Sequence, residues 1–416
     1  GSERPDEVLV FTGHLDHPKE SANDNASGSG AMMDMAITLK RLIDQGHLPQ
    51  PKRSIRFIWV PEFYGTMAYV DAHPEMVGPA LGGSFLGNIN MDMVGENLEL
   101  IHTKMILTRT PPSNPSVLND VVENMAGMVS GMNIRTSRGS LSEPNIRMTP
   151  YSGGSDHNIF IDRKIPGMML GHSPDYTHHT SEDTEEKVDP VELERSEVLA
   201  TAAFLYLSNL TAAEGVELAY LAGANAADRL GEAVREGVRH LLAAPPEAVN
   251  HAWNEVQNRI EHHSRWGMDA VKDILHFNDS PEVKVAVEGQ LRVLEEQAEI
   301  LADAVAETAG SKGARGLRPP ELGRPVDARV PVRLTRGPLA GGLPASALSP
   351  ERAAWYTSPQ NALRGNIPFE LVNFINGERT VTEIRDALSA EFAPVPTQAV
   401  ARFVEDMVTA GLAEWS

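Results

Sequence analysis

The chain has no cysteine among its 416 residues, so it can form no disulfide bond and offers no thiolate ligand to a metal. Any metal site must therefore use His, Asp and Glu side chains. The absence of cysteine is typical of a cytoplasmic protein, although secretion stays open. No apolar run reaches the roughly 18 residues that a membrane-spanning helix needs, so we expect no membrane partner.

Positive charge is also scarce, because 36 Lys and Arg residues face 57 Asp and Glu residues and leave a net charge of −21. A surface this acidic argues against nucleic acid and against an anionic membrane surface as partners. The hydrophobic fraction of 41% is ordinary for a folded protein. A chain of this length is sufficient for two or three domains with separate cores.

Strands and helices alternate over the first half of the chain. Residues 7–13, 55–60 and 86–93 form apolar runs that are typical of buried strands. Residues 31–45 place apolar side chains on one face of a helix. Each strand run ends at or beside a polar residue. We therefore expect an α/β fold with a mostly parallel sheet flanked by helices, and a site at the carboxyl ends of the strands.

The character of the sequence then changes, and we divide the chain into four parts. Residues 1–210 form the α/β core, and residues 211–310 are helical and rich in Ala and Leu. Residues 311–349 are rich in Pro, Gly and Arg and are interpreted as an extended linker. Residues 350–416 resemble a winged helix-turn-helix. Nine acidic and five basic residues in this module argue against DNA binding and favour docking or peptide holding.

The helical region contains an apolar seam, which runs from Val287 to Val305 with a four-three spacing. Such a seam packs against a neighbouring helix. We favour packing within the chain over a coiled-coil dimer, and a homo-oligomer stays an alternative. His262 and His263, in the same region, are expected to face solvent.

Five residues of metal-ligand type recur in the first half, each inside a short polar motif. They are His14, Asp24, Glu62, Asp92 and His179. No motif is informative alone, but together they place hard oxygen and imidazole donors on the loops of an α/β sheet. Two zinc ions about 3.5–4 Å apart could be held for hydrolysis in this way, with one carboxylate bridging them.

Asp24 is the natural bridge, because it lies in a tight turn beside a helix start. His14 and Asp92 would complete the first metal site, and His179 would serve the second. Asp16 follows His14 by two residues and could accept the other ring N–H of that imidazole or fix its loop.

Asp183, four residues after His179, has two interpretations. It could orient that histidine as Asp16 orients His14. It could equally cap the start of a helix.

These motifs resemble those of di-zinc aminopeptidases related to glutamate carboxypeptidase II and the transferrin receptor. The matching pieces, within residues 8–210, are Gly-His-Leu-Asp at 13–16, Asp-Asn-Ala-Ser-Gly at 24–28, Pro-Glu-Phe-Tyr-Gly-Thr at 61–66, Asn-Met-Asp-Met at 90–93, Gly-Ser-Asp-His-Asn-Ile-Phe at 154–160 and His-Thr-Ser-Glu-Asp-Thr at 179–184. The resemblance implies a zinc exopeptidase, in the first place an aminopeptidase, acting on a peptide or protein. It also implies His14, Asp24, Asp92 and His179 as ligands of one or two zinc ions.

The sequence departs from the family pattern at position 63. The family usually has two adjacent glutamates, a general base and then a ligand of the second metal, whereas Phe63 follows Glu62 here. We assign Glu62 as the base that takes a proton from a metal-activated water, because hydrolysis needs a proton acceptor more than a second metal. The alternative makes Glu62 a ligand and leaves the base missing. His17 and His172 are the histidines that could replace a lost ligand.

Two further departures bear on function. His178 stands where the family often has an oxyanion-stabilising tyrosine, and it could donate a hydrogen bond in the same way. The family's opening helix and first strands would precede residue 7, so we expect a cleaved chain or an N-terminal partner segment that completes the sheet.

Two other functional hypotheses stay open. A catalytically silent binding or scaffold protein on the same fold is the main alternative, and Phe63 favours it. In the other, hydrolysis is retained and the module of residues 350–416 holds a polypeptide substrate beside the core.

Overall fold

The computed structural model describes residues 1–315, 326–339, 345 and 347–416. Contacts divide the chain into a first unit, residues 1–218 with 273–280, and a second unit, residues 219–272 with 281–416. The four-part division of the sequence stays a prediction, and part of its linker lies outside the described residues. No helix in the described ranges is long and apolar enough to span a membrane.

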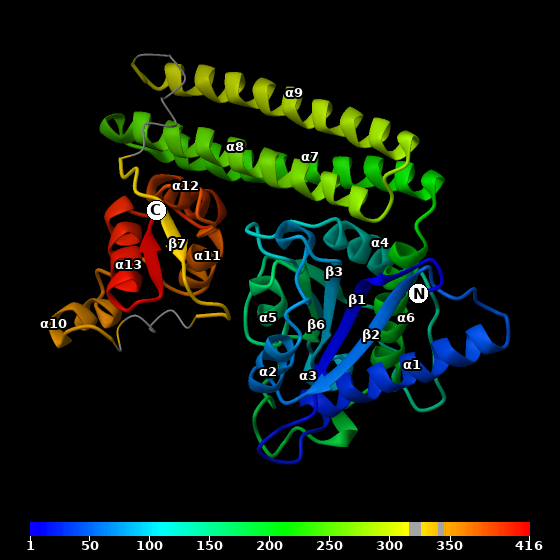
Figure 1. Ribbon diagram of the computed structural model, residues 1–416. Coiled ribbons are helices and arrows are strands. Elements are labelled where there is room, and N and C mark those ends of the chain that lie inside the picture. The colour runs from blue at the N-terminus through cyan, green and yellow to red at the C-terminus, as the bar shows by residue number, and fades with distance from the viewer. Residues whose placement is uncertain (316–325, 340–344, 346) are drawn as a thin grey trace. The chain divides into compact units, whose positions relative to one another are not determined.

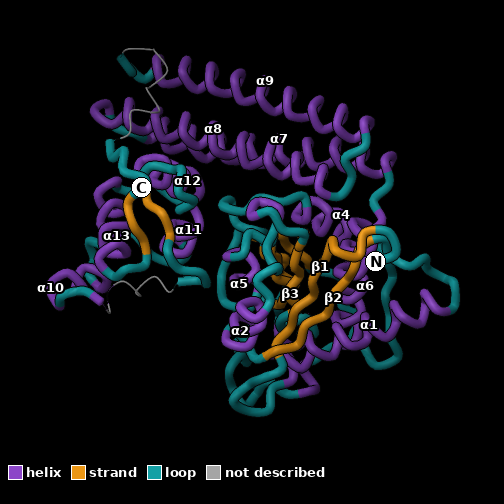
Figure 2. Tube along the Cα trace, in the orientation of Figure 1, coloured by secondary structure: helices purple, strands orange, loops and turns teal. Residues whose placement is uncertain are grey.

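A six-stranded sheet forms the centre of the first unit (Figures 1 and 2). Its strands are β1 (Arg4–His14), β2 (Arg53–Val60), β3 (Phe85–Met91), β4 (Met105–Thr108), β5 (Ile146–Thr149) and β6 (Gly167–His172), in the order β2-β1-β3-β6-β4-β5. The first four in this order run parallel, and β4 is antiparallel to β6. The predicted α/β fold with a mostly parallel sheet is confirmed.

Helices cover both faces of this sheet. Successive residues of a strand point to opposite sides, so β1 contributes apolar side chains to both faces. Val8 and Val10 of β1 share a buried cluster with residues of α2 and α5. On the other face, the rings of Phe11 and Phe204 lie 4.3 Å apart, and α6, which carries Phe204, contacts α1 and α4. The helices of this unit are α1 (Gly28–Asp44), α2 (Tyr64–Ala72), α3 (Leu98–Ile101), α4 (Leu118–Ser130), α5 (His157–Asp162) and α6 (Pro190–Asn209).

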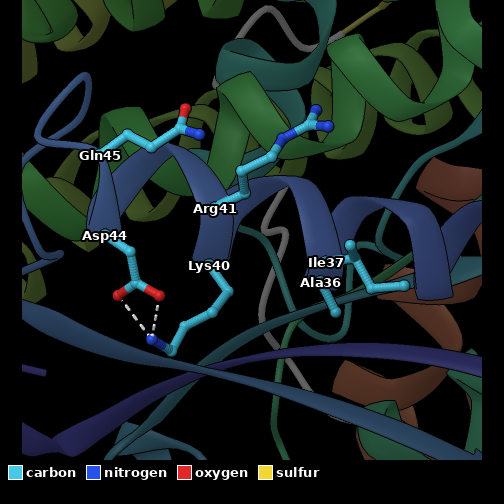
Figure 3. A pocket seen from close by; sticks show the side chains of 6 residues that line it. All are labelled: Ala36, Ile37, Lys40, Arg41, Asp44 and Gln45. Carbon is cyan, nitrogen blue, oxygen red and sulfur yellow. Dashed lines mark hydrogen bonds and ion pairs between the residues drawn. The ribbon is translucent and has the colours of Figure 1, made fainter.

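The second half of α1 carries a shallow surface hollow (Figure 3). Lys40 Nζ lies 2.5 Å from Asp44 Oδ1 within it, and both side chains are mostly exposed. An exposed ion pair of this kind contributes little to stability. The hollow is lined by Ala36, Ile37, Lys40, Arg41, Asp44 and Gln45. None of these residues is a predicted site residue.

The second unit contains long helices, and prolines lie where these helices are separated, at Pro245, Pro246 and Pro281. They are α7 (Ala212–Ala243), which begins in the first unit, α8 (Val249–Asp273) and α9 (Pro281–Ser311). Val305 of the predicted apolar seam is buried in one cluster with Leu230 of α7 and Val256 of α8. Packing of the seam within the chain is confirmed.

The C-terminal module combines helices with a two-stranded sheet. β7 lies inside the range predicted as linker, and its pairing with β8 makes this short stretch part of the module. Its three residues are too few to give a periodic pattern in the sequence. The winged-helix assignment stays a prediction. The elements are β7 (Pro331–Arg333), α10 (Pro350–Ala353), α11 (Ile367–Phe374), α12 (Val381–Glu391), α13 (Thr397–Thr409) and β8 (Ala413–Trp415).

The expectation that His262 and His263 face solvent is wrong. His262 is buried, and its Nδ1 donates to the backbone oxygen of Asn258 at 3.0 Å. His263 is partly buried, and its Nε2 donates to the backbone oxygen of Ala390 in α12 at 3.2 Å. α12 follows α8 by more than 100 residues, so the pattern of α8 alone could not reveal this contact.

Candidate metal centre and active site

Three predicted site residues lie at the carboxyl ends of neighbouring strands. His14 is the last residue of β1, Asp92 directly follows β3, and Glu62 follows β2 by two residues. β1 pairs in parallel with both β2 and β3. The ends of parallel neighbours meet at one edge of a sheet, where α/β proteins bind their ligands.

Asp24 lies between two groups of side chains, one at each oxygen of its carboxylate. Its Oδ1 is 3.1 Å from His14 Nε2, which is 3.3 Å from Asp92 Oδ1. Its Oδ2 is 3.1 Å from His179 Nε2 and 3.5 Å from His17 Nε2. A carboxylate that directs one oxygen to each of two donor groups has the arrangement that a bridging metal ligand needs.

The group at Oδ1 is buried, and we call it the deep group: His14, Asp24 and Asp92. Its side chains are between 3% and 7% exposed. His14 Nδ1 lies 2.9 Å from the backbone oxygen of Asp16, which can only accept, so Nδ1 carries the proton and Nε2 faces the carboxylates. Burial lowers the pKa of His14, but its contacts with Asp24 and Asp92 outweigh burial and raise that pKa to about 11. The deep group therefore has a strong preference for a cation.

The group at Oδ2 is nearer to solvent, and we call it the open group: His17, Asp24 and His179. The His17 side chain is 15% exposed and that of His179 is 66% exposed. His178 Nε2 is also 3.3 Å from Asp24 Oδ2, and its ring lies 3.7 Å from that of His179. The donor atoms of each group lie within 4.8 Å of one another, which is close enough to share one metal ion. Imidazole nitrogens and carboxylate oxygens are donors that suit zinc.

Asp183 holds the turn that carries Asp24. Its carboxylate accepts the backbone N–H groups of Asn23 at 2.8 Å and of Asp24 at 2.9 Å. It also accepts the hydroxyl of Ser21 at 2.6 Å. The sequence predicts that Asp183 orients His179 or caps the start of a helix. Instead, its hydrogen bonds go to the Asp24 turn, because the loop after His179 folds back over that turn.

Glu62 lies on a turn that is held from both sides. Asp16 Oδ1 accepts the N–H of Glu62 at 2.7 Å, and Asp156 Oδ1 accepts the N–H of Phe63 at 2.8 Å. Phe63 has a φ of 53°, a left-handed conformation that is rare for a bulky residue and costs free energy. Its side chain packs against the hydrophobic cluster of α2 and α5. Position 63 therefore offers no donor to a metal.

The surroundings of Glu62 suit a proton acceptor. Burial raises the pKa of Glu62 to about 7, the charge of Asp92 adds to the effect, and His14 opposes it. A carboxyl group that titrates near neutral pH can take a proton and return it. Among the described residues, the two groups of clustered donors do not include Glu62.

The roles of Asp156 and His172 differ from what the sequence predicts. Asp156 is buried and also accepts the hydroxyl of Thr66 at 2.7 Å, so it positions the Glu62 turn. The sequence predicts no role for Asp156. His172 is not a substitute ligand, because its Nδ1 donates to the oxygen of Met93 and its Nε2 lies 3.1 Å from Glu192 Oε2.

The order and placement of these residues agree with a known family. The sequence pattern of peptidase family M28 matches residues 1–204. Residues 1–204, just under half of the chain, are therefore similar to peptidase family M28. The narrower relationship to glutamate carboxypeptidase II and the transferrin receptor stays a prediction. No curated protein matches the chain.

Solved structures similar to the chain include three aminopeptidases. A zinc aminopeptidase from Bacillus subtilis is 23% identical over 50% of this chain and 47% of its own, with a TM-score of 0.39. An aminopeptidase from Aneurinibacillus sp. strain AM-1 is 20% identical over 49% and 44%, with a TM-score of 0.38. The LapA aminopeptidase of Legionella pneumophila is 19% identical over 50% and 53%, with a TM-score of 0.37. The chain therefore spans about half the length of these relatives.

Proposed function

We propose that residues 1–204, which match peptidase family M28, form a zinc-dependent exopeptidase, in the first place an aminopeptidase. The observation that carries the proposal is the carboxylate of Asp24, which has imidazole and carboxylate donors at Oδ1 and imidazole donors at Oδ2. The match of residues 1–204 to a peptidase family supports it. A scaffold protein would have no need for a cluster of buried donors at the strand ends.

The deep group would hold one zinc ion, and Asp24 with His179 would hold a second. When bound, zinc supplies a Lewis acid that lowers the pKa of a water molecule and polarises the scissile carbonyl. Glu62 takes the proton of the attacking water and returns it to the leaving amine, a task that suits its pKa of about 7. His178, exposed beside Asp24, donates a hydrogen bond to the oxyanion.

Asp16 and Asp156 position the proposed base without touching the substrate. Each accepts a backbone N–H of the Glu62–Phe63 turn, at 2.7 and 2.8 Å. The base is therefore fixed by the backbone on which it sits, and its carboxylate stays free to move a proton. A role for the C-terminal module in holding a polypeptide stays a prediction.

Zinc content and hydrolysis of a panel of aminoacyl amides test this function together. His14→Ala should lose stoichiometric zinc by elemental analysis, and with it hydrolysis, because it removes the central imidazole of the deep group. His73→Ala is a matched control, since the His73 side chain is 40% exposed and its contacts with Tyr69 and Glu75 are local. Full zinc content in His14→Ala would contradict the assignment. Bound zinc in the wild type with no hydrolysis of any amide would favour the silent scaffold.

A further inference from the structure

We propose that His17 is a ligand of the second metal ion, with Asp24 and His179, and takes the place of the carboxylate that is missing at position 63. This inference rests on the proposed function and specifies its open metal site. It makes the second site richer in imidazole than the family pattern implies.

The need for a further ligand follows from Phe63. Its side chain is turned into the hydrophobic cluster of α2 and α5, and its N–H is held by Asp156. The second metal would then keep only Asp24 and His179 among the predicted ligands. Zinc sites in proteins normally use three or four protein ligands, so two would hold the ion weakly.

His17 is placed to supply that ligand. Its Nε2 lies 3.5 Å from Asp24 Oδ2, the oxygen that also faces His179. The rings of His17 and His179 are 5.4 Å apart. The donor atoms of these three residues lie within 4.8 Å of one another, and His17 contributes from the loop directly after β1.

The protonation of His17 is also suitable. Its Nδ1 lies 3.1 Å from the backbone oxygen of Lys19 and 3.5 Å from the backbone nitrogen of the same residue. The shorter contact favours a proton on Nδ1, which leaves a lone pair on Nε2. Nε2 is buried and has no hydrogen-bond partner among the residues that the structure describes. A buried lone pair facing a carboxylate oxygen is repulsive unless a cation lies between them.

His178 is the competing residue, since its Nε2 also lies 3.3 Å from Asp24 Oδ2. Its side chain is 42% exposed, whereas that of His17 is 15% exposed. Among the described residues, the clustered donors include His17 and not His178. We therefore keep for His178 the proposed role of hydrogen-bond donor to the oxyanion.

The exchange of a carboxylate for an imidazole changes the metal preference of the open site. A neutral nitrogen donor removes one negative charge from the ligands of the second ion. Imidazole suits Zn²⁺, Co²⁺ and Ni²⁺, whereas Mg²⁺ and Mn²⁺ prefer carboxylate oxygens. We therefore expect Mn²⁺ to compete poorly for the open site.

Metal stoichiometry of the full chain tests the proposal without using activity. The metal-free protein is titrated with Zn²⁺ and, separately, with Co²⁺, whose absorption spectrum reports nitrogen ligands. The wild type should bind two equivalents. His17→Ala should bind one tightly, with the second weakened by roughly 100-fold or more, since even residues that only orient a ligand cost 10–100-fold. His178→Ala is the matched control and should keep two. His17→Glu, which restores a carboxylate, should keep two and bind Mn²⁺ better.

The outcomes separate this proposal from the proposed function. Two tight equivalents in His17→Ala, or a loss in His178→Ala alone, would overturn the role of His17 and leave the hydrolase intact. One equivalent in both the wild type and His17→Ala would do the same. A wild type that binds no zinc would refute the proposed function itself. If His17→Ala does not fold by circular dichroism, His17→Gln replaces it with the same expected loss.

Discussion

The chain contains two His-His pairs whose surroundings differ in every respect that matters for metal binding. His178 and His179 lie on an exposed loop of the first unit, with both Nε2 atoms within 3.3 Å of Asp24 Oδ2. His262 and His263 lie in α8 of the second unit, donate to backbone oxygens and contact the edge of Trp266. One pair faces a carboxylate from an accessible loop, and the other is held by neutral partners in a core.

This difference shows that adjacent histidines carry no function by themselves. An imidazole can bind a metal when its lone pair faces other donors, as around Asp24. In α8 the same residue type fills space between helices, and burial lowers the pKa of both His262 and His263. The neighbouring charges, and not the sequence motif, decide between these roles.

The largest effect is expected when the carboxylate of Asp24, which faces His178 and His179, is removed. Asp24→Ala leaves His178 and His179 without the anion that they face and also opens the deep group. We expect zinc content to fall from two equivalents to less than one, and hydrolysis to be lost. His262→Gln serves as the control and should keep both equivalents. Elemental analysis of the two purified variants makes the comparison, and equal zinc content would contradict it.

A smaller effect is expected at Glu62, where loss of activity without loss of zinc would distinguish a general base from a metal ligand. Glu62→Gln should keep both zinc equivalents while kcat falls by roughly 10²- to 10⁴-fold, because glutamine cannot accept the proton of the attacking water. Steady-state kinetics on an aminoacyl amide and metal analysis of the same sample measure both properties. Loss of one zinc equivalent would instead assign Glu62 as a ligand.

The smallest effect concerns the loss of stability in acid that the burial of His263 causes. Burial lowers the pKa of His263 to about 4 from its ordinary value of 6.5. Below pH 6.5 the unfolded chain therefore binds a proton that the folded chain does not, and stability is lost as pH falls toward 4. We expect the free energy of unfolding of the second unit to drop by roughly 2 kcal/mol from this group between pH 7 and pH 5.

Urea unfolding followed by tryptophan fluorescence measures this loss, since Trp253, Trp266, Trp355 and Trp415 all lie in the second unit. The glutamine of His263→Gln cannot be protonated in this range, so the free energy of unfolding of this variant should depend less on pH. An unchanged slope in this variant would mean that His263 is not responsible.

Much of the core and its site could be predicted because strand ends carry a local signal. His14 and Asp92 each close an apolar run, and parallel strands bring such ends together. Asp24 was predicted from a tight turn before a helix. For these residues, local sequence and sheet topology contain most of the information that fixes their position.

The residues that hold the site in place could not be predicted in the same way. Asp156 and Asp183 act on backbone N–H groups more than 90 residues away in the sequence, and any residue except proline offers such a group. His17 and His172 were equivalent by their nearness to motifs. The contact of His172 with Glu192 and the position of His17 beside Asp24 separate them. These contacts depend on the three-dimensional fold, to which a single sequence gives no direct access.

Asp16 couples the predicted metal ligand to the predicted base. Its backbone oxygen accepts the ring N–H of His14, and its carboxylate accepts the backbone N–H of Glu62. A displacement of this one residue therefore carries both partners in the same direction, so their separation varies less than the position of either. A shift of about 1 Å at a reacting group can cost 10²-fold in rate. The spacing between ligand and base is thus set by two contacts of Asp16, one through its backbone oxygen and one through its carboxylate, and it does not depend on the rim of the site, where His179 is largely exposed.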